Sequence, residues 1–153
     1  MVTSAALLIV LVLISVIDIR TRTIPDVLSL PLVAAGIVRA MLDVQHGAPS
    51  SLLTDSVIGA TAGYLLFAAI GAAFFRLRGE EGLGLGDAKL LAAAGAWLGW
   101  QMLPLAILIA SVGGLVQVAI AAYASATRPS DQSLAFGPWL AFSFFSLWIL
   151  SIQ

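Results

Sequence analysis

The chain has 153 residues, no cysteine and a formal net charge of −1. Hydrophobic residues make up 61% of it and charged residues 10%, and its mean hydropathy is +1.07. Soluble domains contain about 45–50% apolar and about 25% charged residues. The composition therefore excludes an ordinary soluble domain, a disordered chain and a nucleic-acid-binding protein, and the lack of cysteine excludes disulfides and thiolate metal sites.

The charged residues divide the apolar chain into six segments. A membrane-spanning helix needs about 20 apolar residues, so the chain has room for about six. The uncharged stretch from Leu90 to Thr127 would be roughly 57 Å long as one helix, and we divide it at Pro104. The sequence predicts an all-α, polytopic membrane protein that forms one domain over residues 1–153. The expected helices are 2–18, 26–42, 55–75, 87–101, 103–126 and 132–151.

Many polar and small residues have structural interpretations. Asp55 and Asp131 precede apolar runs, as helix N-caps do. Arg39 is expected to extend its side chain to the membrane interface. Three acids are expected to be solvated in loops, with substrate contact as the alternative for the last two: Asp43, Glu80 and Glu81. Three pairs of small residues spaced four apart predict close helix packing: Gly59 and Gly63, Gly95 and Gly99, and Ala110 and Gly114.

The basic residues predict the orientation of the chain in the membrane. Six of the seven lie in the first, third and fifth connections between helices, and Arg39 lies on the other side. Lys and Arg concentrate in cytoplasmic loops, so we expect these three connections in the cytoplasm and both termini outside. The first segment has no basic residues before its apolar run and no clear cleavage site, so it is expected to remain as a helix rather than act as a signal peptide.

Asp18 and Asp87 are acids at the edges of predicted membrane helices. Asp18 directly follows an uncharged segment, and Asp87 opens the fourth helix after the stretch Gly82–Gly86. Ionisable groups at membrane depth are costly and usually face the bundle interior or a wet cavity. Two whole helices separate the aspartates in sequence, so they must lie on the same side of the membrane.

Two carboxyl groups at one depth are candidates for acid–base catalysis. Like charges placed close together cannot both ionise cheaply, so one group serves as base and the other as acid. The base takes a proton from a water that attacks a peptide carbonyl, and the acid protonates the leaving amine. This chemistry needs neither a metal nor a cofactor.

The glycines before Asp87 fit the same chemistry. Glycine lets another chain approach its backbone closely, so Gly84 and Gly86 would leave room for an extended substrate. The alternative is that both glycines only form a loop and that Asp87 caps the fourth helix.

Three motifs, in this order, resemble those of type IV prepilin peptidases. The first is DIRTRTIPD from Asp18 to Asp26, and the second is GLGDAKL from Gly84 to Leu90, written GxGDxKL in the family. The third, AFGPWLA from Ala135 to Ala141, is similar to the family's last-helix F-G-P segment, although many members have a proline where Ala135 stands. GxGD alone is a weak signal, whereas the three together over nearly the whole chain are specific.

The resemblance implies an integral-membrane aspartic endopeptidase whose catalytic residues are Asp18 and Asp87. Members of the family remove the short, basic leader of prepilin or pseudopilin proteins at the cytoplasmic face of the plasma membrane. They cut after a glycine, just before the apolar helix of the pilin. The implied partners are these substrates and the lipid bilayer, with no nucleic acid and no cofactor.

Many bacterial members also methylate the new N-terminus and carry an extra cytoplasmic domain, often with paired cysteines. This chain has no cysteine, and its length leaves no room for that domain. It looks more like the short, peptidase-only forms of tight-adherence (Flp) pilus systems or the archaeal preflagellin peptidases. Methyl transfer is therefore not expected.

Three further residues are expected to support the site. Pro25 fixes a turn into the second helix, since proline suits the first helical position. Asp26 is either the cap or first-turn acid of that helix, or a support for the site. Lys89 lies roughly 200° around a helix from Asp87, so it is expected to be an interfacial anchor or to pair with another acid such as Asp26.

Two other functions would use the same residues. A proton-coupled transporter or channel subunit also needs buried carboxyl groups, but transporters often place them near the midplane in inverted repeats, and the halves of this sequence show no repeat. A protease of the presenilin or signal-peptide-peptidase type would cut within the membrane. Those proteases carry their first aspartate after a tyrosine, whereas Ile17 precedes Asp18 here.

Overall fold

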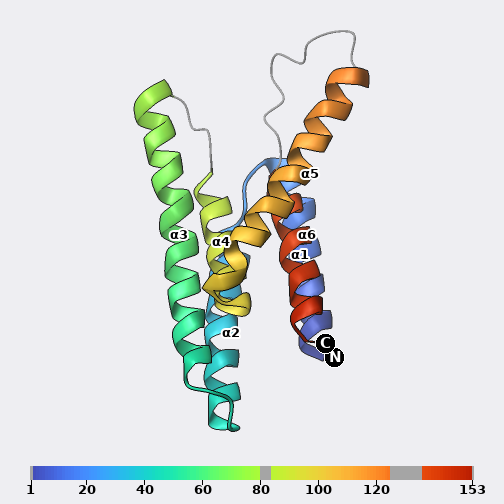
Figure 1. Cartoon of the computed structure of the whole chain (residues 1–153). Helices are drawn as coiled ribbons and strands as arrows, with labels where there is room; N and C mark the ends of the chain where they lie inside the picture. Colours follow the sequence, from blue (N-terminus) through green and yellow to red (C-terminus); the bar gives the residue numbers. More distant parts are fainter. Residues whose placement is uncertain (1, 80–83, 125–135, 153) are drawn as a thin grey trace.

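The chain folds into six α-helices and one short 3-10 helix (Figure 1), in a computed structural model that describes residues 2–79, 84–124 and 136–152. No strand occurs within these ranges, so the predicted all-α class is confirmed. The helices are α1 (Val2–Thr21), α2 (Asp26–Gln45), α3 (Ser51–Arg78), α4 (Leu85–Leu98), η1 (Trp100–Met102), α5 (Leu103–Ala124) and α6 (Gly137–Ser151).

Within the described ranges, four segments are long and apolar enough to cross a membrane: α1, α2, α3 and the η1–α5 segment. The other two helices are shorter, with 15 residues in α6 and 14 in α4. At about 1.5 Å per residue α4 is roughly 21 Å long, less than the about 30 Å of a bilayer's hydrocarbon core. These helices are those of a polytopic membrane protein, as expected.

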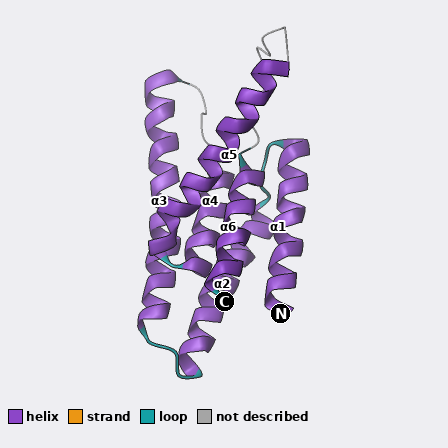
Figure 2. Cartoon of the chain, turned by 45° about the vertical axis from the view of Figure 1, so that its right-hand side comes forward, coloured by secondary structure: helices purple, strands orange, loops and turns teal. Residues whose placement is uncertain are grey.

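The short helix α4 lies at the centre of the bundle. It packs against α2, α3, α5 and α6, and every residue from Leu90 to Ala96 is buried. A helix surrounded by protein does not have to match the thickness of the bilayer, which explains how α4 can be short. α6 packs against both α4 and α1, and it lies between them in Figure 2.

Glycines bring the backbones of α3 and α4 into direct contact. A Cβ added to Gly95 would overlap the carbonyl oxygen of Gly59, and one added to Gly59 would overlap the carbonyl of Gly95. One turn away, a Cβ on Gly63 would lie 2.7 Å from the carbonyl oxygen of Leu91. The packing role predicted for Gly59, Gly63 and Gly95 is confirmed.

The break between α4 and α5 differs from the prediction. α4 ends at Leu98 rather than at residue 101, because Gly99 takes φ 80° and ψ 165°, a conformation that favours glycine. The chain then passes through η1, and Pro104 lies in the first turn of α5, where a proline is tolerated. Gly99, not Pro104, therefore breaks the long apolar stretch, and its predicted place in a helical small-residue pair is wrong.

The start of α3 also differs from the prediction. The helix begins at Ser51, so Asp55 lies inside it and is not its N-cap. The apolar residues after Pro49 extend the helix by one turn, and the Asp55 carboxylate instead accepts a hydrogen bond from the Trp100 indole at 3.0 Å. Several residues interpreted from sequence lie outside the described ranges: Glu80, Glu81, Arg128, Asp131 and Ala135.

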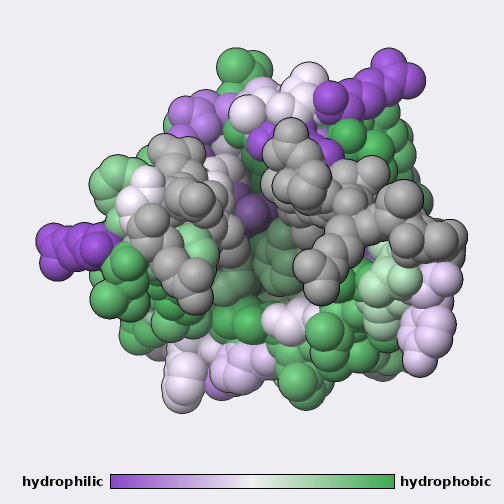
Figure 3. Space-filling model, turned by 90° about the horizontal axis from the view of Figure 1, so that it is seen from above, coloured by the Kyte–Doolittle hydropathy of each residue, from purple (hydrophilic) through white to green (hydrophobic). Residues whose placement is uncertain are grey.

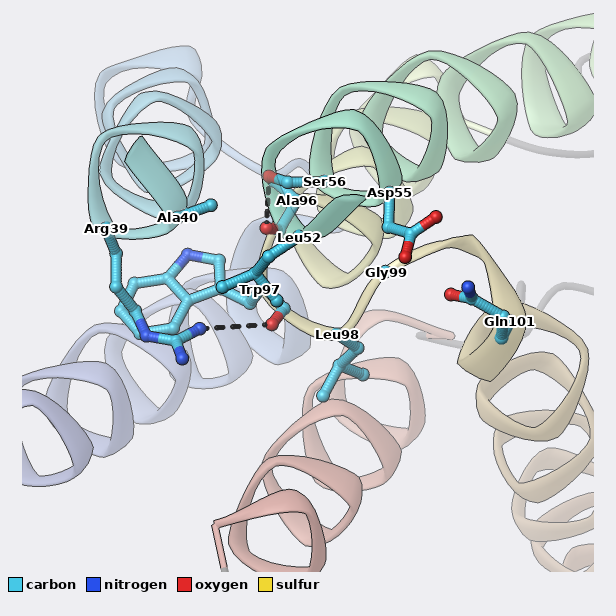
Figure 4. A pocket seen from close by; sticks show the side chains of 10 residues that line it. All are labelled: Arg39, Ala40, Leu52, Asp55, Ser56, Ala96, Trp97, Leu98, Gly99 and Gln101. Atoms are coloured by element: carbon cyan, nitrogen blue, oxygen red, sulfur yellow. Dashed lines mark hydrogen bonds between the residues drawn. The ribbon is translucent and has the colours of Figure 1, made fainter. Parts of the chain in front are cut away.

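The C-terminal end of α4 lies among other helices, and its last carbonyls have partners there. The Ser56 hydroxyl donates to the carbonyl of Ala96 at 2.6 Å, and Arg39 donates to that of Trp97 at 3.4 Å. These side chains surround the small pocket in Figure 4. The Arg39 guanidinium also lies 4.3 Å from the centre of the Trp148 ring and 3.0 Å from the Asp43 carboxylate.

Candidate active site

Asp18 lies in the last turn of α1 and is almost completely buried, with 5% of its surface exposed. The helix ends three residues later, where Arg22 takes a left-handed φ of 54° and its N–H bonds to the Asp18 carbonyl at 2.8 Å. The Asp18 side chain accepts a hydrogen bond from the backbone N–H of Gly137, with 3.1 Å between N and Oδ2. Gly137, in the last helix, therefore holds the carboxyl group of Asp18, in the first helix.

Asp87 lies in the first turn of α4 and is half-buried. The residue at the N-cap position is Gly84, whose carbonyl accepts the Asp87 N–H at 3.1 Å. No side chain forms a cap hydrogen bond at this end of α4. The alternative in which Asp87 serves as the cap of its helix is therefore wrong.

The two aspartates lie at the same end of the bundle. Asp18 comes from the end of α1 and Asp87 from the start of α4, and Ile24 lies between Gly86, which precedes Asp87, and Gly137, which bonds to Asp18. This agrees with the prediction that both lie on the same side. Figure 3 views the molecule from this end and shows a hollow with a hydrophilic residue in its depth and apolar residues on its walls.

Ile24 lies between the helices that carry the site. It is buried, and it stands in the short connection between α1 and α2. A Cβ added to Gly86 of α4 would lie 2.9 Å from the Ile24 Cβ, and one added to Gly137 of α6 would lie 3.3 Å from its Cδ1. The space beside Gly86 is thus filled by Ile24 and not left for a substrate. Among the described residues, only Asp87 and Gly86 atoms approach a Cβ placed on exposed Gly84, both at 3.9 Å.

Lys89 and Asp26 join α4 to the start of α2. The Lys89 Nζ lies 2.5 Å from Oδ1 of Asp26, which is the first residue of α2 and forms no cap hydrogen bond. The expected pairing of these two residues is therefore present, and Asp26 is the first-turn acid of its helix. Pro25 occupies the N-cap position, one residue before the predicted one, and its carbonyl accepts the N–H groups of Leu28 and Ser29.

Sequence reasoning missed two residues that contact the candidate site: Ile24 and Gly137. Both stand inside motifs that signalled the family, yet neither carries a polar side chain that would draw attention. The signal for Gly137 was the proline that follows it, because Pro near a helix start marks an N-terminus whose N–H groups are free to bind an anion. Ile24 gave no such signal, because its role depends on which helices surround it.

The residues around the aspartates support acid–base chemistry. Within residues 2–79, 84–124 and 136–152, no three His, Cys, Asp or Glu side chains gather as metal ligands would. Asp18 is buried and held by a backbone N–H, whereas Asp87 is half-buried. Different surroundings of two carboxyl groups can make one the base and the other the acid.

Comparison with known proteins identifies the family. Residues 5–119 match the type IV leader peptidase family. The chain belongs to this family. Both Asp18 and Asp87 lie in the matched range, and Gly137 lies beyond it. No solved structure matches the chain.

Three curated relatives share the name prepilin leader peptidase/N-methyltransferase. The chain is 46% identical over 127 residues to the protein of Escherichia coli (strain K12). The aligned residues cover 83% of this chain and 53% of that protein. It is 48% identical over 135 residues to that of Dickeya chrysanthemi, with 88% of this chain and 45% of that protein covered. It is 44% identical over 141 residues to that of Aeromonas hydrophila, with 91% and 47% covered. The chain thus spans about half the length of these relatives.

Proposed function

We propose that the chain is a membrane-embedded aspartic endopeptidase that removes the leader peptide of type IV prepilin-like proteins. The observation that carries the proposal is the position of Asp18 and Asp87 at the same end of the bundle, in a chain of the leader peptidase family. The proposed substrates are prepilins or pseudopilins that are cut after a glycine, just before their apolar helix.

In the proposed reaction the two aspartates activate one water. One carboxylate accepts a proton from the water, whose oxygen attacks the carbonyl carbon of the scissile peptide bond. The second carboxyl group donates its proton to the leaving amine as the C–N bond breaks. The products are a leader with a free carboxylate and a pilin with a free N-terminus. Gly84 is the supporting residue beside Asp87 that leaves room for an extended chain.

We place this reaction at the cytoplasmic face of the plasma membrane. Three basic residues lie at or just beyond helix ends on the same side of the bundle as Asp18: Arg20, Arg22 and Arg76. Arg39 lies toward the other end of α2. Basic residues concentrate on the cytoplasmic side of membrane proteins. Both termini lie together at the opposite end of the bundle (Figure 1), which favours an outward location for them.

The proposal is tested by removing either carboxylate. The full chain is reconstituted in lipid vesicles with a prepilin that carries its leader, and cleavage is followed by mass spectrometry. Asp18→Asn and Asp87→Asn should each abolish leader removal, since asparagine neither takes up nor releases the proton. Membrane insertion should be unchanged, because both substitutions keep the size of the side chain.

Asp43→Asn is the matched control, because Asp43 is a carboxylate near the opposite end of α2. It should cleave at the rate of the unmodified chain. Full leader removal by the Asp87→Asn variant would overturn the proposal. A cut within the apolar helix of the pilin, instead of before it, would point to intramembrane proteolysis.

We propose the peptidase step alone for this chain. The relatives' names join that step to N-methyl transfer, and we expect the mature pilin released by this chain to keep an unmethylated N-terminus. The mass of the mature pilin, measured after incubation in a cell extract that contains methyl donors, tests this expectation. A gain equal to one methyl group that depends on the chain would contradict it.

A further inference from the structure

The first turn of α6 offers one free backbone donor, and it is directed at Asp18. The N–H groups of Trp139 and Leu140 both bond to the carbonyl of Phe136 at 3.1 Å. Pro138 has no N–H. Of the four residues that begin α6, Gly137 alone therefore has an N–H available for a partner outside the helix, and that N–H lies 3.1 Å from Oδ2 of Asp18.

A side chain at position 137 would displace the Asp18 carboxyl group. A Cβ on residue 137 would lie 2.6 Å from Oδ2 of Asp18, 3.0 Å from its Cγ and 3.3 Å from Cδ1 of Ile24. Real Cβ atoms do not approach neighbouring atoms as closely as 2.6 Å, so any side chain would push the carboxyl group away. The hydrogen bond from the residue 137 N–H to Asp18 therefore depends on the absence of a side chain at that residue.

Because Asp18 lies in the last turn of α1, its carboxylate depends more strongly on the Gly137 hydrogen bond. A carboxylate in the last turn of a helix faces the negative end of the helix dipole, which is unfavourable, whereas the N-terminus of a helix attracts negative charge. Asp18 is 5% exposed, so water is a poor substitute for a protein donor. α6 contributes no charged residue, and it reaches the carboxyl group through the Gly137 N–H.

We propose that Gly137 is a positioning residue for the aspartate pair: its N–H holds the Asp18 carboxyl group in the orientation that it needs beside Asp87. The inference rests on the proposed function, because it concerns the same two aspartates. Gly137 touches neither water nor substrate in this scheme and acts through Asp18 alone. Since α6 also packs against α1 and α4, the donor is fixed relative to both helices that carry the pair.

The sharpest test removes the N–H without adding an atom. Glycolic acid, incorporated at position 137 by cell-free translation into lipid nanodiscs, replaces the N–H with an ester oxygen. Hydrogen bonds to charged groups are stronger than those between neutral groups, so we expect kcat for leader cleavage to fall roughly 10- to 100-fold. KM for the prepilin should stay unchanged, because a positioning role does not alter substrate binding.

Gly137→Ala should lower kcat by at least as much, since the added Cβ displaces the Asp18 carboxyl group. Gly113→Ala is the matched control. A Cβ on Gly113 of α5 would overlap the Trp139 ring, so it disturbs the packing of α6 without approaching Asp18. The control should lower thermal stability but keep the kcat of the folded protein, measured below its unfolding temperature.

The outcomes separate this inference from the proposed function. If the two Asp→Asn variants are inactive and the ester variant cleaves at the rate of the unmodified chain, the peptidase assignment stands and the role of Gly137 falls. An equal loss of kcat in Gly137→Ala and Gly113→Ala would also overturn the inference, because general disturbance of α6 would then explain both. If the Asp→Asn variants remain active, the proposed function itself falls.

Discussion

Lys89 of α4 and Asp26 of α2 form an ion pair one half-turn beyond the candidate catalytic Asp87, with 2.5 Å between Nζ and Oδ1. The Asp26 side chain is 57% exposed, so solvent screens the pair. We expect Asp26→Asn and Lys89→Gln each to lower the free energy of unfolding by about 1 kcal/mol or less. Thermal unfolding of the single and double variants, compared as a double-mutant cycle, measures the coupling.

The same variants test whether the pair supports the reaction. Among the described residues, the Lys89 ammonium bonds to Asp26 and to neither catalytic aspartate, so leader cleavage should fall by less than about tenfold, which corresponds to about 1.4 kcal/mol. A larger loss of kcat in Lys89→Gln than in Asp26→Asn would contradict a purely structural pair. It would show that the Lys89 charge itself acts on the substrate or on Asp87.

Ile24 should set the spacing between the starts of α4 and α6, because its side chain fills the gap between Gly86 and Gly137. Ile24→Ala removes that filling, and we expect it to lower stability by about 2–5 kcal/mol and to lower kcat in the folded protein as well. Leu32→Ala is the control, since Leu32 is similarly buried but lies in the α2 core. It should cost similar stability and leave kcat unchanged. Equal kcat values for the two folded variants would remove the spacing role of Ile24.

The contact between α3 and α4 should tolerate no side chain at Gly95. A Cβ there would overlap the Gly59 carbonyl, which belongs to rigid helix backbone and cannot rotate away. We expect Gly95→Ala to lower the free energy of unfolding by about 1–3 kcal/mol or more, as overpacking does. Ala62→Val adds bulk to an exposed position of α3 and is the control. Denaturation in lipid or detergent micelles compares the two, and equal stability would contradict the close contact.

The helices and the common side of the two aspartates were predictable because they depend on local or topological properties. Uninterrupted apolar runs identify helices in lipid whatever surrounds them. An even number of crossings between Asp18 and Asp87 fixes their common side even when helix boundaries shift by several residues. Helix geometry indicated only that Lys89 faces away from Asp87, and the pairing with Asp26 was one of two expectations, beside an interfacial anchor.

Details that depend on neighbouring helices were not predictable. The break at Gly99 requires a positive φ, and sequence alone did not distinguish this glycine from those that pack in helices, such as Gly95. Asp55 resembled an N-cap, but α3 begins earlier and the carboxylate bonds to Trp100, a partner 45 residues away. The role of Gly86 was assigned to substrate because the sequence does not show that Ile24 lies against it.

Arg39 should stabilise the end of α4 that lies farthest from the aspartates. Its guanidinium donates to the Trp97 carbonyl, stacks over Trp148 and pairs with Asp43. A cation near the C-terminus of a helix is favourable, and stacking on an aromatic ring adds about 0.5–2 kcal/mol. We therefore expect Arg39→Ala to lower the free energy of unfolding by about 2 kcal/mol.

Arg39→Lys separates charge from stacking, because lysine keeps the charge but lacks the planar group that covers the ring. Its stability should lie between those of Arg39→Ala and the unmodified chain, and Asp43→Asn should lose about 0.5 kcal/mol, as exposed pairs do. All three should cleave prepilin at the normal rate per folded molecule, since Asp18 lies at the opposite end of the bundle. A fall in kcat for folded Arg39→Ala would mean instead that the helices that run from the Arg39 contact toward the aspartate end, α2, α4 and α6, transmit changes along their length to the pair.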